Sequence, residues 1–184
     1  MNKELFNIIK NVAKEYNIDP YFIYAVGTVE SNNNKGFDSN GNIVVRFEKH
    51  VFSKYIKKDK NTQHLIDRVN ELKGSGFNTF KTAVNLDEHK ALLSTSFGMF
   101  QIMGFNYDYC GYRDVESFVD SLSRSEENQV RAFCSFVIKN NLVRYINDKN
   151  YSRFAYYYNG PAYEKNNYDN KLERAYLNVV KQVQ

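Results

Sequence analysis

Residues 19–31 read DPYFIYAVGTVES and predict an apolar helix that ends in a carboxyl group. Asp19 is a good N-cap, and Pro20 fits the first helical position, where its missing N–H costs nothing. Apolar side chains then recur at helical spacing, at Phe22, Ile23, Val26 and Val29. This spacing places them on one face of a helix over residues 20–30, with Glu30 as its last residue.

Glu30 stands in an unusual place for a carboxylate. An anion at a helix C-terminus is disfavoured by the helix dipole, and nearby apolar groups raise a carboxyl pKa by desolvation. Both effects favour the protonated form, which a general acid needs near neutral pH. The alternative is a solvated glutamate at a fraying helix end, because the polar run 31–36 cannot easily continue the helix.

Composition is that of one folded domain over residues 1–184, with 42% hydrophobic and 16% aromatic residues and a mean hydropathy of −0.61. We expect no stable membrane insertion, because no apolar run reaches about 18 residues, and the N-terminus lacks a signal-peptide core. A net charge of +4 is too mild for a dedicated nucleic-acid binder. The densest basic run is formed by Lys54, Lys57, Lys58 and Lys60.

Neither the cysteines nor the histidines are spaced as ligands of a metal ion, so we expect no metal and no cofactor. Cys110 and Cys134 are interpreted as two buried thiols, since free cysteine packs as a small hydrophobe.

Helical periodicity dominates the chain, so the predicted fold is mainly α. Helices are expected over residues 3–16, 20–30, 51–56, 65–72, 78–92 and 168–183, and after a capping box formed by Ser123 and Glu126. A small β ribbon is expected near residues 36–48, because Asn40-Gly41 is a strong turn signal and residues 43–47 are β-rich.

Four motifs follow one another along this pattern: VES at 29–31, RFEKH at 46–50, SFGMFQIMG at 96–104, and AYYYNGP at 155–161 followed by YDNKL at 168–172. In this order they resemble the N-acetylmuramidase family of phage endolysins, over roughly residues 17–176. They are also similar to the wider lysozyme-like superfamily, which includes goose-type lysozymes and lytic transglycosylases. The resemblance implies a lysozyme-like helical domain.

The resemblance also implies roles for particular residues. Glu30 would protonate the glycosidic oxygen, and Ser96, Gly98 and Gln101 would form the opposite wall of the site. Gly98 permits close backbone approach, and Gln101 offers a donor and an acceptor to a sugar amide. The alternative for this segment is a tight turn with Gln101 on the surface.

Tyr158 and Asn159 would orient the acid or hold an N-acetyl group. The alternative is a core tyrosine followed by an Asn-Gly-Pro helix stop. The aromatic residues Phe100, Tyr156 and Tyr157 are interpreted as core rather than as surfaces for sugars.

A second carboxylate is less well defined. Two carboxyl groups lie about 5–5.5 Å apart in retaining glycosidases and about 6.5–9.5 Å apart in inverting ones. Glu48 is the leading candidate, with an ion pair to Arg46, Lys49 or Arg131 as its alternative, and Asp38 is a weaker one. If neither acts, the sugar's own N-acetyl oxygen would assist and the product would be a 1,6-anhydro sugar.

The resemblance therefore implies an enzyme that cleaves the bond between N-acetylmuramic acid and N-acetylglucosamine. The expected partner is the glycan strand of peptidoglycan, and the expected state is a monomer without a separate wall-binding module. Such an endolysin would be made in the host bacterial cytoplasm and would act in the periplasm after release. The alternatives are a lytic transglycosylase and a non-catalytic wall-binding protein of the same fold.

Overall fold

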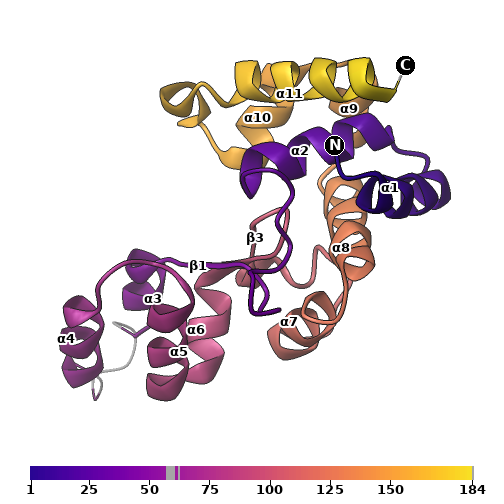
Figure 1. The fold of residues 1–184 in the computed structure, drawn as a ribbon. Coiled ribbons are helices and arrows are strands. Elements are labelled where there is room, and N and C mark those ends of the chain that lie inside the picture. The colour runs from indigo at the N-terminus through magenta and orange to yellow at the C-terminus, as the bar shows by residue number, and fades with distance from the viewer. Residues whose placement is uncertain (57–60, 62, 184) are drawn as a thin grey trace.

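A computed structural model describes residues 1–56, 61 and 63–183, and shows a mainly helical molecule with a small antiparallel sheet (Figure 1). Lys57, Lys58 and Lys60 of the basic run lie outside the described residues. The elements are α1 Lys3–Tyr16, α2 Pro20–Glu30, β1 Val45–Phe47, α3 Lys49–Ile56, α4 Gln63–Glu71, α5 Phe77–Leu86, α6 Glu88–Leu93, β2 Thr95–Phe97, β3 Ile102–Met103, η1 Gly104–Asn106, α7 Val115–Leu122, α8 Glu126–Lys139, α9 Val143–Asn147, α10 Tyr151–Asn159, η2 Tyr163–Asn166 and α11 Tyr168–Val183.

Helix α2 begins and ends at the predicted residues. The Asp19 carboxylate accepts hydrogen bonds from the backbone N–H groups of Tyr21, at 2.8 Å, and Phe22, at 3.4 Å. These bonds satisfy two of the donors that a helix start leaves unpaired. The middle of α2 is buried between α1 and α11, so most of its sides face protein. Burial on several sides fixes the direction in which its last residue points.

The sheet is completed by a distant part of the chain. Strand β1 pairs antiparallel with β2, with Arg46 opposite Ser96, and β2 pairs with β3. Within the predicted ribbon region only one bridge forms around the Asn40-Gly41 turn, between Phe37 and Ile43. The expected ribbon is therefore present as β1, but its partner strands come from residues 95–103.

Several helix boundaries differ from the prediction, and two of the differences have a clear local cause. Residues 78–92 form two helices, because Asp87 adopts an extended conformation and caps α6 through the N–H of Lys90. Ser125 caps α8 through the N–H of Asn128, whereas Ser123 ends α7. Helix α7 was not predicted. Ser123, which the sequence pattern assigned as the N-cap of the following helix, is instead the C-cap of α7.

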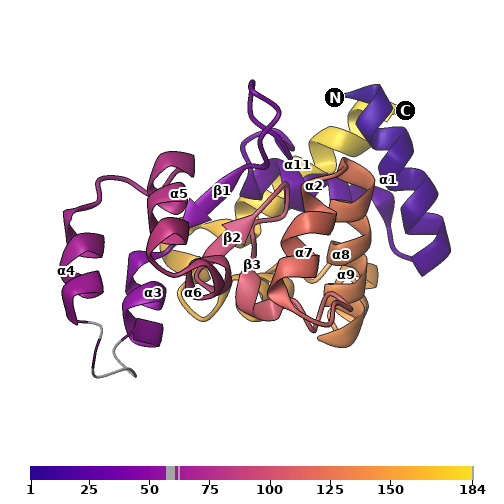
Figure 2. The same cartoon turned by 90° about the horizontal axis from the view of Figure 1, so that it is seen from below.

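Most of the helices form two groups, one at each end of the strands. Helices α3–α6 gather at one end of β1 and β2, and α1, α2 and α8–α11 form a larger group at the other end (Figures 1 and 2). The chain ends meet, since the N-terminal ammonium group donates a hydrogen bond to the side chain of Gln182 at 2.9 Å. Cys110 and Cys134 are free and buried, as predicted. Among the described helices, none has the length and apolar character needed to cross a membrane.

Candidate active site

Glu30 is the last residue of α2 and is partly buried. Burial raises the pKa of its carboxyl group from 4.5 to about 7, and this effect outweighs two opposing ones. The hydrogen bond from Tyr168 and the positive charge of Arg46 both lower the pKa. A carboxyl group with a pKa near 7 is half protonated at neutral pH, which suits a general acid.

Tyr168 holds one oxygen of this carboxyl group. Its hydroxyl group donates a hydrogen bond to Oε1 of Glu30 at 2.5 Å, the length expected when a hydroxyl binds a carboxylate. Tyr168 is the first residue of α11 and is only 4% exposed, so its ring is fixed by packing. In the described part of the chain no side chain binds Oε2 of Glu30, which leaves that oxygen to carry a transferable proton.

Tyr168 was not predicted as a site residue. Its sequence signal is a tyrosine on the buried face of the last helix, together with Leu172, Ala175 and Val179. A buried tyrosine hydroxyl needs a hydrogen-bond partner, but the sequence pattern does not say which one.

The polar residues after Glu30 form an ordered cap rather than a frayed end. The Ser31 hydroxyl group donates to the carbonyl oxygen of Gly27 at 2.9 Å, and the Asn34 amide donates to the Thr28 hydroxyl at 2.7 Å. Asn32, Asn33 and Asn34 all have positive φ angles. Asparagine adopts this conformation more readily than most residues. The turn therefore folds back on the last two turns of α2 and holds Glu30 in place.

Gly27 makes this packing possible. A Cβ atom at Gly27 would lie 2.1 Å from Oδ1 of Asn34 and 2.9 Å from Cγ of Met99. Asn34 thus covers one side of α2, and the segment that contains Met99 approaches it closely. Any side chain at Gly27 would push both neighbours away from the helix that carries Glu30.

Glu48 follows β1 and takes part in two charge contacts. Its Oε1 lies 3.1 Å from Nε of Arg46, and its Oε2 lies 3.5 Å from Nδ1 of His50. The charge of Arg46 also acts on Glu30, where it lowers the pKa of the carboxyl group. Of the expected ion pairs, only the one with Arg46 forms.

The other two predicted partners of Glu48 are engaged elsewhere. Lys49 donates to the carbonyl oxygen of Leu72, and Arg131 pairs with Glu15 and Glu127. Asp38, the weaker candidate for the second carboxylate, is exposed and accepts hydrogen bonds from Asn40 and Asn42 within its own turn.

Ser96 of strand β2 is joined to Gln101, which lies in the loop between β2 and β3. The Ser96 hydroxyl donates to Oε1 of Gln101 at 2.9 Å, and Nε2 of Gln101 donates to the carbonyl oxygen of Gly98 at 2.8 Å. The amide of Gln101 is therefore oriented before any ligand binds. Each of its polar atoms still has capacity for one more hydrogen bond.

Gly98 is buried, and the close approach that it permits is to protein. Its φ angle is +69°, and a Cβ atom there would lie 2.6 Å from Oε1 of Gln129. Gln129, which is 1% exposed, accepts a hydrogen bond from the N–H of Met99 at 2.8 Å and donates to the carbonyl oxygen of Leu122. Gln129 was not predicted, yet it supports the whole loop from α8.

Tyr158 is close to Glu30 but does not bind its carboxyl group. Its hydroxyl donates to the carbonyl oxygen of Phe100 at 2.8 Å, and its ring packs against Phe133 and Phe154. Burial, followed by the charge of Glu30, raises the pKa of Tyr158 well above its usual value. Asn159 is exposed and ends α10, as in the alternative interpretation of a core tyrosine before a helix stop.

The interpretation of three aromatic residues as core holds for only one of them. Phe100 is 2% exposed and stacks on Phe133 with ring centroids 4.4 Å apart. Tyr156 and Tyr157 are instead 45% and 51% exposed. They lie on the outer face of α10, whereas Phe154 and Ala155 lie on its buried face.

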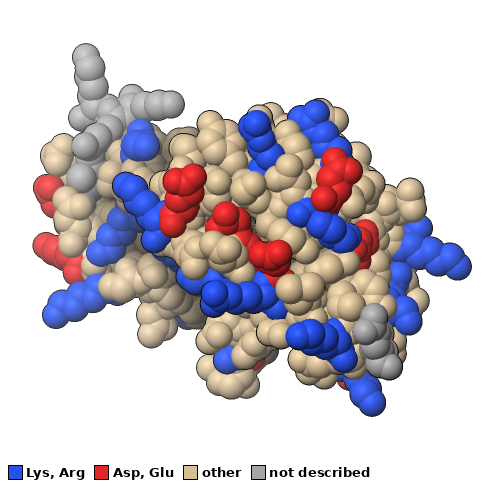
Figure 3. Space-filling model, turned by 90° about the horizontal axis from the view of Figure 1, so that it is seen from above, with Lys and Arg blue, Asp and Glu red and all other residues tan. Residues whose placement is uncertain are grey.

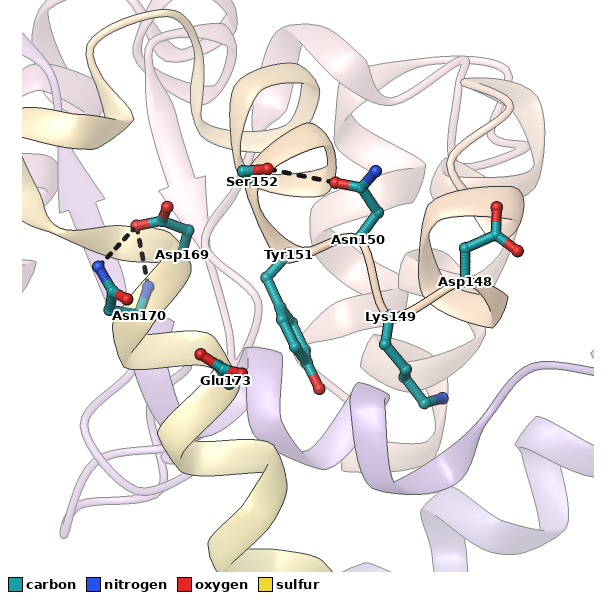
Figure 4. A pocket seen from close by; sticks show the side chains of 8 residues that line it. All are labelled: Asp148, Lys149, Asn150, Tyr151, Ser152, Asp169, Asn170 and Glu173. Carbon is teal, nitrogen blue, oxygen red and sulfur yellow. Dashed lines mark hydrogen bonds between the residues drawn. The ribbon is translucent and has the colours of Figure 1, made fainter.

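A separate pocket of about 410 Å³ lies between the start of α10 and α11 (Figure 4). Asp148, Asp169 and Glu173 are among the side chains that line it, and none of the predicted site residues does so. Within the described residues, no group of histidine, cysteine, aspartate and glutamate side chains is arranged to hold a metal ion.

Comparisons with known proteins identify the family to which the chain belongs. Residues 19–179 match the sequence model of the Muramidase family, described as N-acetylmuramidase. The fold is similar to the crystal structure of the Burkholderia AP3 phage endolysin, with a TM-score of 0.78 and 31% identity over 96% of this chain and 71% of that one. A search of the curated protein sequences finds no significant match. The chain therefore belongs to the N-acetylmuramidase family, whose members are glycoside hydrolases that degrade peptidoglycan.

Proposed function

We propose that the protein hydrolyses the bond between N-acetylmuramic acid and N-acetylglucosamine in peptidoglycan, with Glu30 as the general acid. One observation carries the proposal: Glu30 has a pKa of about 7, and Tyr168 binds one of its oxygens while the other is left for proton transfer. A carboxyl group that is held at one oxygen and protonated at the other is oriented for donation.

The first step is the transfer of a proton from Oε2 of Glu30 to the glycosidic oxygen. The bond between that oxygen and the anomeric carbon breaks, so the leaving sugar departs as an alcohol and the anomeric carbon becomes oxocarbenium-like. Water then adds to this carbon and loses a proton. Glu30 regains a proton from solvent before the next turnover.

Glu48 is proposed to act on the attacking water or to stabilise the positive anomeric carbon. Its position beside Arg46, whose charge also acts on Glu30, supports a place in the same site. Two carboxyl groups in one cleft take different roles when their surroundings differ. Glu30 is surrounded by the apolar end of α2, whereas Glu48 is paired with Arg46 and His50.

Ser96, Gly98, Gln101, Tyr158 and Asn159 are proposed as the substrate-binding residues. The oriented amide of Gln101 supports a contact with an N-acetyl group, because it can still accept and donate one hydrogen bond each. Gly98 would contribute by letting its loop pack against Gln129. It does not leave free space next to its Cα atom for a ligand.

A lytic transglycosylase is the second candidate. The ion pair of Glu48 with Arg46 supports this candidate, because such a pair is compatible with a purely structural carboxylate. In that reaction Glu30 still donates its proton, but the 6-hydroxyl group of the muramic acid attacks the anomeric carbon. The product is then a 1,6-anhydro sugar, and no water is consumed.

Mass spectrometry of digested peptidoglycan distinguishes the two reactions. Hydrolysis gives fragments that are heavier by one water molecule than the anhydro products of transglycosylation. We expect reducing muramic acid ends. If anhydro ends are the sole products, the enzyme is a lytic transglycosylase and not a hydrolase. If the wall is not digested, both proposals are contradicted.

The biological setting is proposed from the same similarity. The Burkholderia AP3 phage protein is an endolysin, and an endolysin of this kind would be made in the host bacterial cytoplasm and would act on the wall in the periplasm. We further propose that the protein acts as a monomer on peptidoglycan glycan strands.

A further inference from the structure

Three tyrosines form an exposed aromatic surface on α9 and α10, which we call the tyrosine platform: Tyr145, Tyr156 and Tyr157. Tyr156 and Tyr157 are among the most exposed large hydrophobic side chains of the described residues, at 45% and 51%. Single exposed apolar residues are common, but neighbouring aromatic rings that face solvent together indicate a binding surface.

The rings are held in a fixed arrangement. Tyr145 and Tyr157 are parallel, with an interplanar angle of 4° and centroids 5.5 Å apart. Tyr156 meets Tyr157 edge to face, with centroids 5.1 Å apart. The guanidinium group of Arg144 lies 4.6 Å from the centroid of Tyr145. Contacts of this kind limit ring motion, so a ligand would meet a surface that loses little freedom on binding.

Within the tyrosine platform, Tyr156 lies on the opposite side of α10 from Tyr158. Tyr158 faces the core, where its hydroxyl binds Phe100 and the charge of Glu30 reaches it. Residues two apart in an α-helix are rotated by about 200°, so Tyr156 points away from Tyr158. A ligand on Tyr156 would therefore not occupy the position of the bond beside Glu30.

The helices that carry the tyrosine platform have two exposed arginines, and the exposed Asp148 ends α9. Arg144 and Arg153 are exposed and belong to α9 and α10. In the described part of the chain, the ion pairs of arginine involve only Arg46, Arg113, Arg124 and Arg131. Arg144 beside the ring of Tyr145 and the exposed Arg153 on α10, neither of which forms an ion pair with the described residues, fit a ligand that combines flat apolar faces with negative charge.

We propose that the tyrosine platform binds a peptidoglycan glycan strand away from the bond that is cut. The C–H face of a pyranose ring would lie on a tyrosine ring, and the carboxylates of the wall would meet the arginines. This inference rests on the proposed function. Aromatic rings with arginine also suit single-stranded nucleic acid, but a muramidase acts on a polymer of sugars, which favours the glycan.

Sedimentation with purified peptidoglycan sacculi tests the proposal, with every chain carrying Glu30→Gln so that the wall stays intact. Replacing Tyr156 and Tyr157 by alanine should weaken binding at least about tenfold, because two ring contacts are lost. Replacing both by phenylalanine keeps the rings and should change binding by less than about twofold. Phe105→Ala removes a ring that is 42% exposed on η1 and serves as the matched control.

A second measurement separates the tyrosine platform from the active site. With Glu30 intact, the double alanine variant should cleave short soluble glycan fragments at the wild-type rate and sacculi more slowly. The proposal would be overturned if the double alanine variant bound sacculi as well as the unmodified surface does, or if the double phenylalanine variant lost as much binding. It would also be overturned if the double alanine variant lost as much activity on soluble fragments as on sacculi. Binding of a single-stranded oligonucleotide that depends on these tyrosines, with binding to sacculi unaffected, would overturn it as well. Failure of the proposed function would show differently, as no cleavage of either substrate by the unmodified chain.

Discussion

At the scale of single residues, the site depends on the competition between burial and polar contacts at one carboxyl group. Burial raises the pKa of Glu30, while Tyr168 and Arg46 lower it, and the result is a pKa of about 7. With Glu30 as the proposed general acid, turnover needs the protonated carboxyl group, so the rate should fall as the pH rises through about 7. A change in any of these three contributions should move that pH.

Tyr168→Phe should move the alkaline limb of the rate profile to higher pH. The hydroxyl of Tyr168 stabilises the ionised carboxylate, so its removal leaves burial less opposed and raises the pKa of Glu30 further. The ring remains, and the loss of one hydrogen bond should cost about 1 kcal/mol of stability. Rates measured from pH 5 to 9, with melting curves as the control, check this. A limb that stays in place or moves to lower pH would contradict the role given to Tyr168.

Glu48→Gln separates the two mechanisms. If Glu48 acts on water or on the positive anomeric carbon, turnover should fall at least about 10²-fold, with substrate binding largely intact. If Glu48 only pairs with Arg46 and His50, the melting temperature should fall by about 2–4 °C and turnover per folded molecule should persist. We expect the first result. Retained turnover would remove Glu48 from the chemistry and favour assistance by the substrate's N-acetyl group.

At the scale of helices and strands, the site is built where α2, the loop between β2 and β3, and α11 meet. The position of α2 could be predicted to the residue, since Asp19, Pro20 and the apolar spacing are all local signals. The strands β2 and β3 could not, because they are only three and two residues long and almost wholly buried, so no alternation marks them.

Contacts between distant parts of the chain were the hardest to predict. Tyr168 and Glu30 are 138 positions apart, and Gln129 supports Met99 from 30 positions away. Local periodicity shows that such polar residues are buried but does not identify their partners. Resemblance to a family predicts that Glu30 and the Gln101 segment belong to one site, but it leaves Tyr168, which binds the carboxyl group of Glu30, unassigned.

Gly27→Ala tests the packing at the end of α2. Alanine favours helices more than glycine does, yet its Cβ atom would lie 2.1 Å from Asn34 and 2.9 Å from Met99. We expect a loss of about 1–3 kcal/mol in the free energy of unfolding and a lower turnover, because the turn after Glu30 must move. Gly76→Ala is the control, since nothing lies within 4 Å, and it should cost less than about 1 kcal/mol. If the stability of Gly27→Ala is unchanged or raised, the turn formed by residues 31–34 can move without a loss of stability, which would contradict this role of Gly27.

At the scale of the whole molecule, the protein is mildly basic and its substrate is an anionic polymer. The net charge is +4, and lysine, arginine, aspartate and glutamate are interspersed on the face seen in Figure 3. Mixed charge of this kind gives a modest attraction to the wall rather than one strong binding stripe. The attraction should add to binding without replacing the contacts at the site.

Salt should therefore weaken action on intact walls more than action on small substrates. Charges are screened beyond about 10 Å at 0.1 M ionic strength, so cleavage of sacculi should decrease from low to high salt. Cleavage of short soluble fragments should change less, because they meet few charges. Equal rates on sacculi at all salt concentrations would show that the positive charge plays no part.

The most direct test of the central claim is the rate at which Glu30→Gln releases new sugar ends from purified peptidoglycan. Glutamine keeps the shape of the side chain but has no proton to transfer. We expect a loss of at least about 10²-fold. Melting should be little changed, and Glu71→Gln, an exposed glutamate at the end of α4, should keep the full rate. A folded Glu30→Gln protein that clears peptidoglycan at close to the unmodified rate would contradict the role of Glu30 as the general acid.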